Sequence, residues 1–90
     1  MINVTYNAKT ELKRTIDSRN LNPDQFLRLA VPPSWTGPGD FGVVIGGLGV
    51  ADNLVEFEGD TVLLIDADLS AQLSDSVFDF KDGRFTLDVY

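Results

Sequence analysis

Carboxylates and hydroxyls are the main reactive side chains in this 90-residue sequence, because it contains neither cysteine nor histidine. Without thiolate or imidazole, the chain alone cannot build a sulfur-ligated zinc or iron–sulfur site, or a Ser–His or Cys–His nucleophilic pair. Any serine nucleophile would need a lysine base, which could only be Lys9, Lys13 or Lys81. The composition therefore predicts that the protein is not an enzyme and carries no cofactor.

Two aspartates follow the apolar run of residues 62–65, at Asp66 and Asp68. This spacing resembles the first motif of haloacid-dehalogenase-type phosphohydrolases, in which one carboxylate attacks phosphorus and the second handles the proton. That chemistry also needs a lysine, a further acidic pair for magnesium and a larger parallel sheet, for which ninety residues leave no room. A calcium loop starting at Asp66 fails as well, because Ala71 and Val77 fall where glycine and a bidentate glutamate are required. Capping of a short helix explains the two aspartates more simply.

The charge of the chain is −7 and lies unevenly along it. Residues 31–80 contain no Lys or Arg and nine acidic residues: Asp40, Asp52, Glu56, Glu58, Asp60, Asp66, Asp68, Asp75 and Asp79. Such a segment repels phosphate backbones, so we expect no nucleic-acid binding. It suits a protein partner with a basic surface or, as the alternative, a divalent cation or small ligand bound by Glu56, Glu58, Asp60 or Asp40. Solvated strand faces would explain the same residues without a site.

Two loops stand out. Residues 46–49, Gly-Gly-Leu-Gly, complete no phosphate-binding motif, and we expect these glycines to allow a bulge or a close crossing of strands. Trp35 lies among prolines and glycines in residues 32–39, a composition typical of a stiff loop. It either folds back onto the end of the core or anchors a partner. Trp35, Thr36 and Gly37 are therefore the candidate interaction loop.

The elements that position these loops follow from hydrophobic periodicity. Ala8, Leu12 and Ile16 recur every fourth residue, which predicts a helix capped by Thr5 or Asn7 and ended by Asn20 and Pro23. Alternating or continuous apolar runs predict strands at 27–31, 41–45, 54–58, 61–65, 77–80 and 85–90, with a short helix around 69–73. Gly59-Asp60 and Asp82-Gly83 are the predicted hairpin turns.

One N-terminal helix, about six strands and a short inserted helix favour an α+β fold with small antiparallel or mixed sheets, formed by residues 1–90 as a single domain. We expect no membrane association, because no apolar run approaches the roughly 18 residues of a spanning helix. No targeting segment precedes the first helix, so a cytoplasmic protein is the default expectation. A chain this short is only marginally stable alone, and a homodimer would add buried area.

Several segments follow one another in a distinctive order and spacing: Ile2-Asn3-Val4-Thr5, Leu27-Arg28-Leu29-Ala30-Val31, Trp35-Thr36-Gly37, Asp60, Val62-Leu63-Leu64-Ile65-Asp66, Ser70, Leu73 and Phe78-Asp79-Phe80. From residue 2 to about residue 80, this order resembles the HesB/IscA-like domain of A-type iron–sulfur cluster biogenesis proteins.

Carriers of this family bind iron or a cluster through three cysteines, one in a Cys-Ser-Gly turn and two in a later Cys-x-Cys pair. The first cysteine corresponds to Trp35 or its neighbourhood, with Thr36-Gly37 completing the turn, and the pair has no counterpart in these ninety residues. The resemblance thus implies the fold, whereas the missing sulfur ligands predict a member that binds no cluster and acts by protein interaction.

Overall fold

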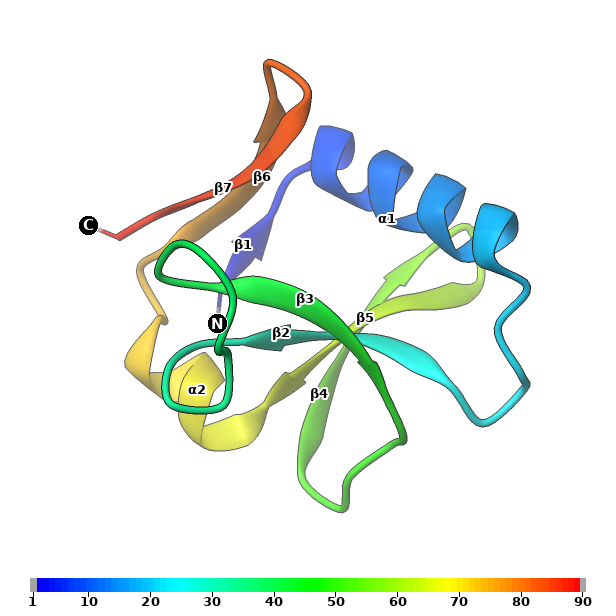
Figure 1. Ribbon diagram of the computed structural model, residues 1–90, viewed down its shortest axis with the longest axis horizontal. Coiled ribbons are helices and arrows are strands. Elements are labelled where there is room, and N and C mark those ends of the chain that lie inside the picture. The colour runs from blue at the N-terminus through cyan, green and yellow to red at the C-terminus, as the bar shows by residue number, and fades with distance from the viewer. Residues whose placement is uncertain (1, 90) are drawn as a thin grey trace.

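Residues 2–89, which the computed structural model describes, form two β-sheets and two helices (Figure 1). In chain order the elements are β1 (Asn3–Val4), α1 (Tyr6–Arg19), β2 (Phe26–Ala30), β3 (Gly42–Gly46), β4 (Asp52–Phe57), β5 (Asp60–Asp66), α2 (Ala67–Gln72), β6 (Val77–Lys81) and β7 (Arg84–Asp88). The α+β class predicted from the sequence is confirmed. The described residues contain seven strands rather than six, because the two-residue β1 is too short to give a periodic signal.

The helix α1 begins and ends where its capping residues require. The hydroxyl of Thr5 accepts a hydrogen bond from the Ala8 backbone N–H at 3.1 Å, so Thr5 and not Asn7 is the N-cap. Asn20 ends the helix in the left-handed conformation, with φ 51°. Ala8 and Leu12 are fully buried, as the four-residue period predicted.

The larger sheet has the strand order β3-β2-β5-β4. β2 pairs antiparallel with β3 and parallel with β5, and β5 pairs antiparallel with β4. Residues 62–65 of β5 are at most 1% exposed, so this strand is buried on both faces, as its continuous apolar run predicted. From the strand order, β3 and β4 are the two outer strands of this sheet.

The smaller sheet has the order β1-β6-β7, with β1 parallel to β6 and β6 antiparallel to β7. Asp82 and Gly83 both have positive φ, which confirms the predicted tight hairpin between β6 and β7. The other hairpin turn was predicted one residue too late. Glu58 and Gly59 carry the positive φ angles of the β4–β5 turn, and Asp60 already belongs to β5.

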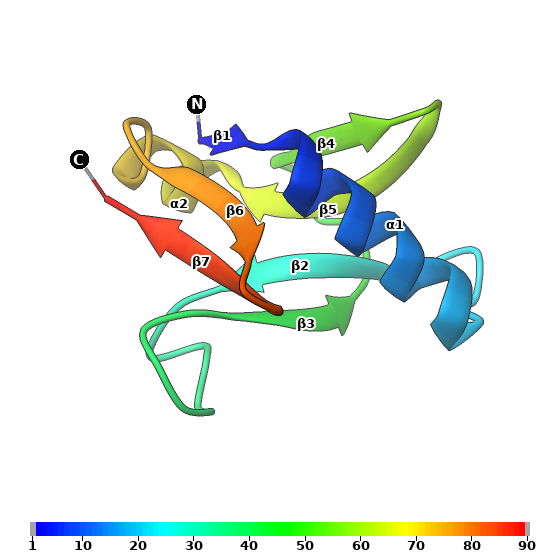
Figure 2. The same cartoon turned by 90° about the horizontal axis from the view of Figure 1, so that it is seen from above.

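The core lies where α1 packs against both sheets, contacting β6 on one side and β5, β4 and β2 on the other (Figure 2). Phe78 of β6 is fully buried at this junction and contacts the rings of Phe41 and Phe85. Thr5 ties the helix to β6, because its hydroxyl also donates to the Asp79 carboxylate at 2.6 Å. Of the two aspartates predicted as possible caps, Asp66 and not Asp68 caps α2, and it accepts hydrogen bonds from the backbone N–H groups of Asp68 and Leu69.

Candidate interaction surface

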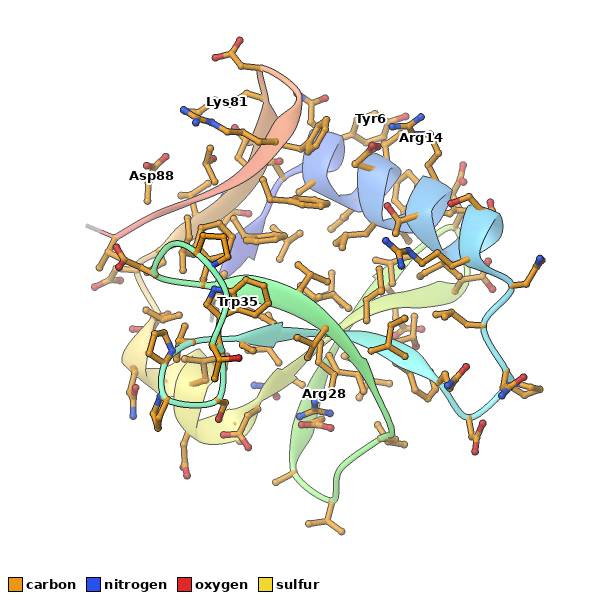
Figure 3. The ribbon with its side chains drawn as sticks, viewed as in Figure 1. Tyr6, Arg14, Arg28, Trp35, Lys81 and Asp88 are labelled. Atoms are coloured by element: carbon orange, nitrogen blue, oxygen red, sulfur yellow. The ribbon has the colours of Figure 1, made fainter. Side chains whose placement is uncertain are left out.

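The Trp35 loop, residues 31–41, connects β2 to β3 and contains a cis peptide bond between Pro32 and Pro33. Trp35 folds back onto this loop (Figure 3), and its indole N–H donates to the Pro38 carbonyl at 3.0 Å. The ring lies against Gly37 and Gly42 so closely that a Cβ atom on either glycine would overlap it. Trp35 and Gly37 are half-buried and Thr36 is exposed. The tryptophan therefore covers the start of β3 and still presents part of its surface to solvent.

Beside this loop, an open groove of about 620 Å³ runs along β3. Its walls are mainly apolar and come from α1, β2, β3 with the residue before it, and β7. The lining residues are Thr15, Arg19, Leu27, Phe41, Gly42, Val43, Val44, Ile45 and Phe85. Ile45 remains 44% exposed on this wall. A further apolar element would fit against these contiguous apolar walls.

The outer strand β3 differs from the other sheet edges of the described residues. β1 is only two residues long, β4 carries Asp52 and Glu56 together with a register shift at residues 55–56, and β7 carries Arg84 and Asp88. Short length, bulges and charges are the features by which proteins prevent edge-to-edge pairing. β3, Gly-Val-Val-Ile-Gly, has none of them. It is an apolar strand whose outer backbone groups are free to pair.

The loop that follows β3, residues 47–51, carries two exposed apolar side chains, Leu48 and Val50, at 58% and 110% exposure. Arg28 of β2 fixes this loop. Its guanidinium donates to the Gly47 carbonyl at 3.0 Å and to both carboxylate oxygens of Asp52, at 2.5 and 2.8 Å. Asp52 also accepts from the Gly49 N–H. Leu48 and Val50 are thus held in the solvent by a fixed loop.

Arg28 and Asp52 form a close ion pair, which we call the Arg28–Asp52 clasp. The Asp52 side chain is 2% exposed, and its hydrogen bonds from Arg28 lower its pKa below the usual value, with the Gly49 N–H adding to the effect against the opposing cost of burial. The same contact raises the pKa of Arg28. Sequence reasoning missed this pair. The available signal was an arginine inside an otherwise apolar strand, preceding fifty residues that contain nine acids and no other cation.

Gly46 and Gly49, at the two ends of residues 46–49, leave room for neighbouring side chains, and the prediction of a bulge or a strand crossing there is wrong. A Cβ atom on Gly46 would meet the Arg28 side chain, and one on Gly49 would meet the Asp52 carboxylate. The β2–β3 pairing runs without a register shift through Gly46. The bulge lies in β4 instead, between Val55 and Glu56.

The acidic residues proposed as an alternative cation site are not gathered together. Asp40 precedes β3, whereas Glu56, Glu58 and Asp60 lie in or beside the β4–β5 hairpin at the opposite edge of the sheet. Asp60 pairs with Lys13 at 2.6 Å. Within residues 2–89, no three acidic side chains come close enough together to hold a metal ion. In the same range, neither helix has the length and apolar character needed to cross a bilayer.

The similarity of this chain to known proteins is found at the level of structure. No protein-family model and no curated protein sequence matches the chain. The structure is similar to the crystal structure of Escherichia coli SufA, a protein involved in the biosynthesis of iron–sulfur clusters, with a TM-score of 0.62 and 20% sequence identity. The match covers 98% of this chain and 79% of SufA. The fold that the sequence resemblance implied is therefore confirmed: this chain has a SufA-like fold.

Proposed function

We propose that this chain is a protein-binding domain that uses a SufA-like fold without carrying a cluster, and that it is not an enzyme. The absence of cysteine and histidine from all ninety residues supports a domain that carries no cluster. Protein-held iron–sulfur clusters need thiolate ligands, with imidazole as the usual substitute. At the turn that corresponds to the Cys-Ser-Gly motif of the carriers, Trp35 packs on glycine and hydrogen-bonds a carbonyl. An indole supplies no donor that could take the place of thiolate.

The observation that carries the proposal is the unprotected apolar edge of β3 beside the Trp35 loop and the groove. An added strand would gain backbone hydrogen bonds from β3, and the groove would receive its side chains. Trp35 lies at the margin of this surface, where a half-buried aromatic ring adds contact area at low entropic cost. The predicted interaction loop Trp35-Thr36-Gly37 is thus one end of a longer surface that continues along β3.

The acidic segment sets the electrostatic field around this surface. With nine acidic residues and no Lys or Arg in residues 31–80, a basic partner would approach faster than an acidic one, and nucleic acid would be repelled. This field affects the rate of encounter and its salt dependence more than the affinity. The apolar edge supplies the affinity in this proposal.

A capture experiment tests the proposal. The tagged chain and its Val44→Lys variant, which places a charge in the middle of β3, are incubated with extract and the bound proteins are quantified. We expect one or more proteins to bind the unmodified chain and to be lost with Val44→Lys, while Leu54→Lys on the other outer strand, β4, retains them. Equal retention by all three forms would contradict binding at β3. Iron and sulfide reconstitution provides the second arm: visible absorbance with stoichiometric iron would contradict a domain without a cluster.

The second candidate function is the binding of a small ligand. The apolar groove supports it only for an apolar ligand. The groove of about 620 Å³ falls within the range of ligand sites in proteins. Since Gly42 lies both in the groove wall and under the Trp35 ring, ligand entry should alter Trp35 fluorescence. Saturable quenching by an apolar compound at micromolar concentration, without any protein partner, would favour this candidate.

A further inference from the structure

We propose that the groove along β3 binds an alkyl carboxylate of medium chain length; this inference rests on the second candidate function, small-ligand binding, and names its ligand class. The alkyl tail would lie against the apolar walls, and the carboxylate would pair with the guanidinium of Arg19. The cation in the groove, the charge of its surroundings and the length of its walls each point to this class of ligand.

Arg19 is the last residue of α1 and lines the groove together with Thr15, one turn earlier in the helix. Helical side chains incline towards the N-terminus of their helix, so that of Arg19 extends back over Thr15 and away from the carbonyl groups that end α1. The Thr15 hydroxyl already donates to the Glu11 carbonyl at 2.9 Å. The guanidinium of Arg19 is therefore the charged donor that this groove offers to a ligand.

The charge of Arg19 is not neutralised by a neighbouring side chain. Arg19 is exposed, and among residues 2–89 it forms no ion pair, whereas Arg14 on the same helix pairs with Glu11. A guanidinium binds a carboxylate through two parallel hydrogen bonds, and one carboxylate balances its charge. An unpaired arginine beside apolar walls therefore suits a ligand with an apolar body and one anionic end.

The surroundings of the groove favour a single negative charge on the ligand. The chain contains fourteen acidic residues and has a charge of −7, yet none of the described residues that line the groove is acidic. A monoanion is attracted by Arg19 at close range, while a dianionic phosphate ester meets twice the repulsion from the rest of the chain. The groove therefore fits a carboxylate better than a phosphate.

The walls of the groove set the length of the apolar tail. Val43 and Ile45 lie on the same face of β3, and Phe41 and Phe85 continue the apolar lining. Each residue of a strand adds about 3.3 Å through three chain bonds, so an extended alkyl chain of about ten carbons is as long as roughly three residues. Such a tail would cover residues 43–45, and a decanoate ion has this length.

Calorimetric titration of the purified chain with sodium decanoate at pH 7 and low salt tests the inference. We expect saturable binding of one decanoate per chain at micromolar concentration. Trp35 emission should change with it, because Gly42 lies both in the groove wall and under the indole ring. Decan-1-ol has a similar tail without the charge and should bind at least about threefold more weakly. Decanoate that shows no saturation below about 1 mM would overturn the inference.

Two arginine variants of α1 separate the proposed contact from general attraction. Arg19→Gln should weaken decanoate binding about three- to tenfold and leave decan-1-ol binding unchanged, because it removes the ion pair alone. Arg14→Gln is the matched control, since it makes the same change of charge on the same helix outside the groove. An equal loss of decanoate binding in both variants would overturn the role of Arg19.

The outcomes distinguish this inference from the functions proposed above. If decanoate does not bind and protein capture still depends on Val44, the inference fails and the proposed protein-binding function stands. If decan-1-ol binds as tightly as decanoate, small-ligand binding stands and the carboxylate class is overturned.

Discussion

Arg28 and Asp52 join β2 to the start of β4 through two parallel hydrogen bonds of 2.5 and 2.8 Å, although β5 lies between the two strands in the sheet. The pair therefore spans the central strand on one face and closes over the loop of residues 47–51. The Arg28 side chain is 22% exposed and Asp52 is almost fully covered. Such a two-point contact fixes direction as well as distance.

Removing the acidic partner should therefore loosen the loop after β3 and lower the stability of the fold. For Asp52→Asn we expect a loss of about 2 kcal/mol in the free energy of unfolding, between the values for exposed and for buried ion pairs. Urea unfolding measures this loss. Asp88→Asn is the matched control, because its pair with Lys81 is long, at 3.8 Å, and half-exposed. An equal loss in both variants would contradict the assigned role of the clasp.

The same pair predicts a pH dependence in acid. Hydrogen bonding to Arg28 lowers the folded-state pKa of Asp52 below its ordinary value, so the unfolded chain takes up this proton first as the pH falls. The stabilisation is complete above the unfolded value and disappears as the pH falls through the lowered folded pKa. The stability difference between the unmodified chain and Asp52→Asn should therefore shrink from pH 6 towards pH 2. A difference that stays constant over this range would contradict the lowered pKa.

The packing of Trp35 on glycine predicts a clear fluorescence response. In Gly42→Ala the new methyl group would overlap the indole ring, so the ring must move into solvent. We expect a red-shifted emission and a loss of about 1–3 kcal/mol in unfolding free energy, as is typical of overpacking. The chain has a single tryptophan, which makes the signal unambiguous. Gly47→Ala is the control, since the only neighbour of its Cβ position lies at 3.9 Å; a matching red shift there would argue against the assigned packing.

Two substitutions of Thr5 can separate the effect of its hydroxyl hydrogen bonds from the effect of its methyl group. Its hydroxyl caps α1 and donates to Asp79 of β6, so Thr5→Ala should cost about 1 kcal/mol or more. Thr5→Ser keeps the hydroxyl and should restore most of the stability. Thermal unfolding of the two variants checks this, and a serine variant as unstable as the alanine variant would show that the methyl group matters instead.

Local signals explain which parts of the fold were predictable from the sequence. The cap at Thr5, the period of Ala8 and Leu12, and the Asp82-Gly83 turn are encoded within a few neighbouring residues, and the structure confirms each. The β4–β5 turn was misplaced because Glu58, unusually for glutamate, adopts positive φ ahead of Gly59. The parallel pairings of β1 with β6 and of β2 with β5 join distant segments, so no local pattern could reveal them.

The candidate surface was predictable only in part for the same reason. The Trp35 loop could be identified from its prolines and glycines, but the position of the ring depends on Gly42, seven residues later in β3. The contact of Arg28 with Asp52 depends on the strand order of the sheet. That β3 is an outer strand also follows from this order, and a strand without charge looks the same in sequence whether it lies at the edge or in the centre.

Hydrogen exchange of the β3 backbone shows whether this edge is a protein-binding surface. The amides of residues 42–46 are followed at low and high protein concentration and with any captured partner, with residues 52–57 of the other outer strand as the internal reference. We expect the protection of β3 to increase on binding while that of β4 does not change. Protection that appears in β4 and leaves β3 exchanging at its original rate would contradict it.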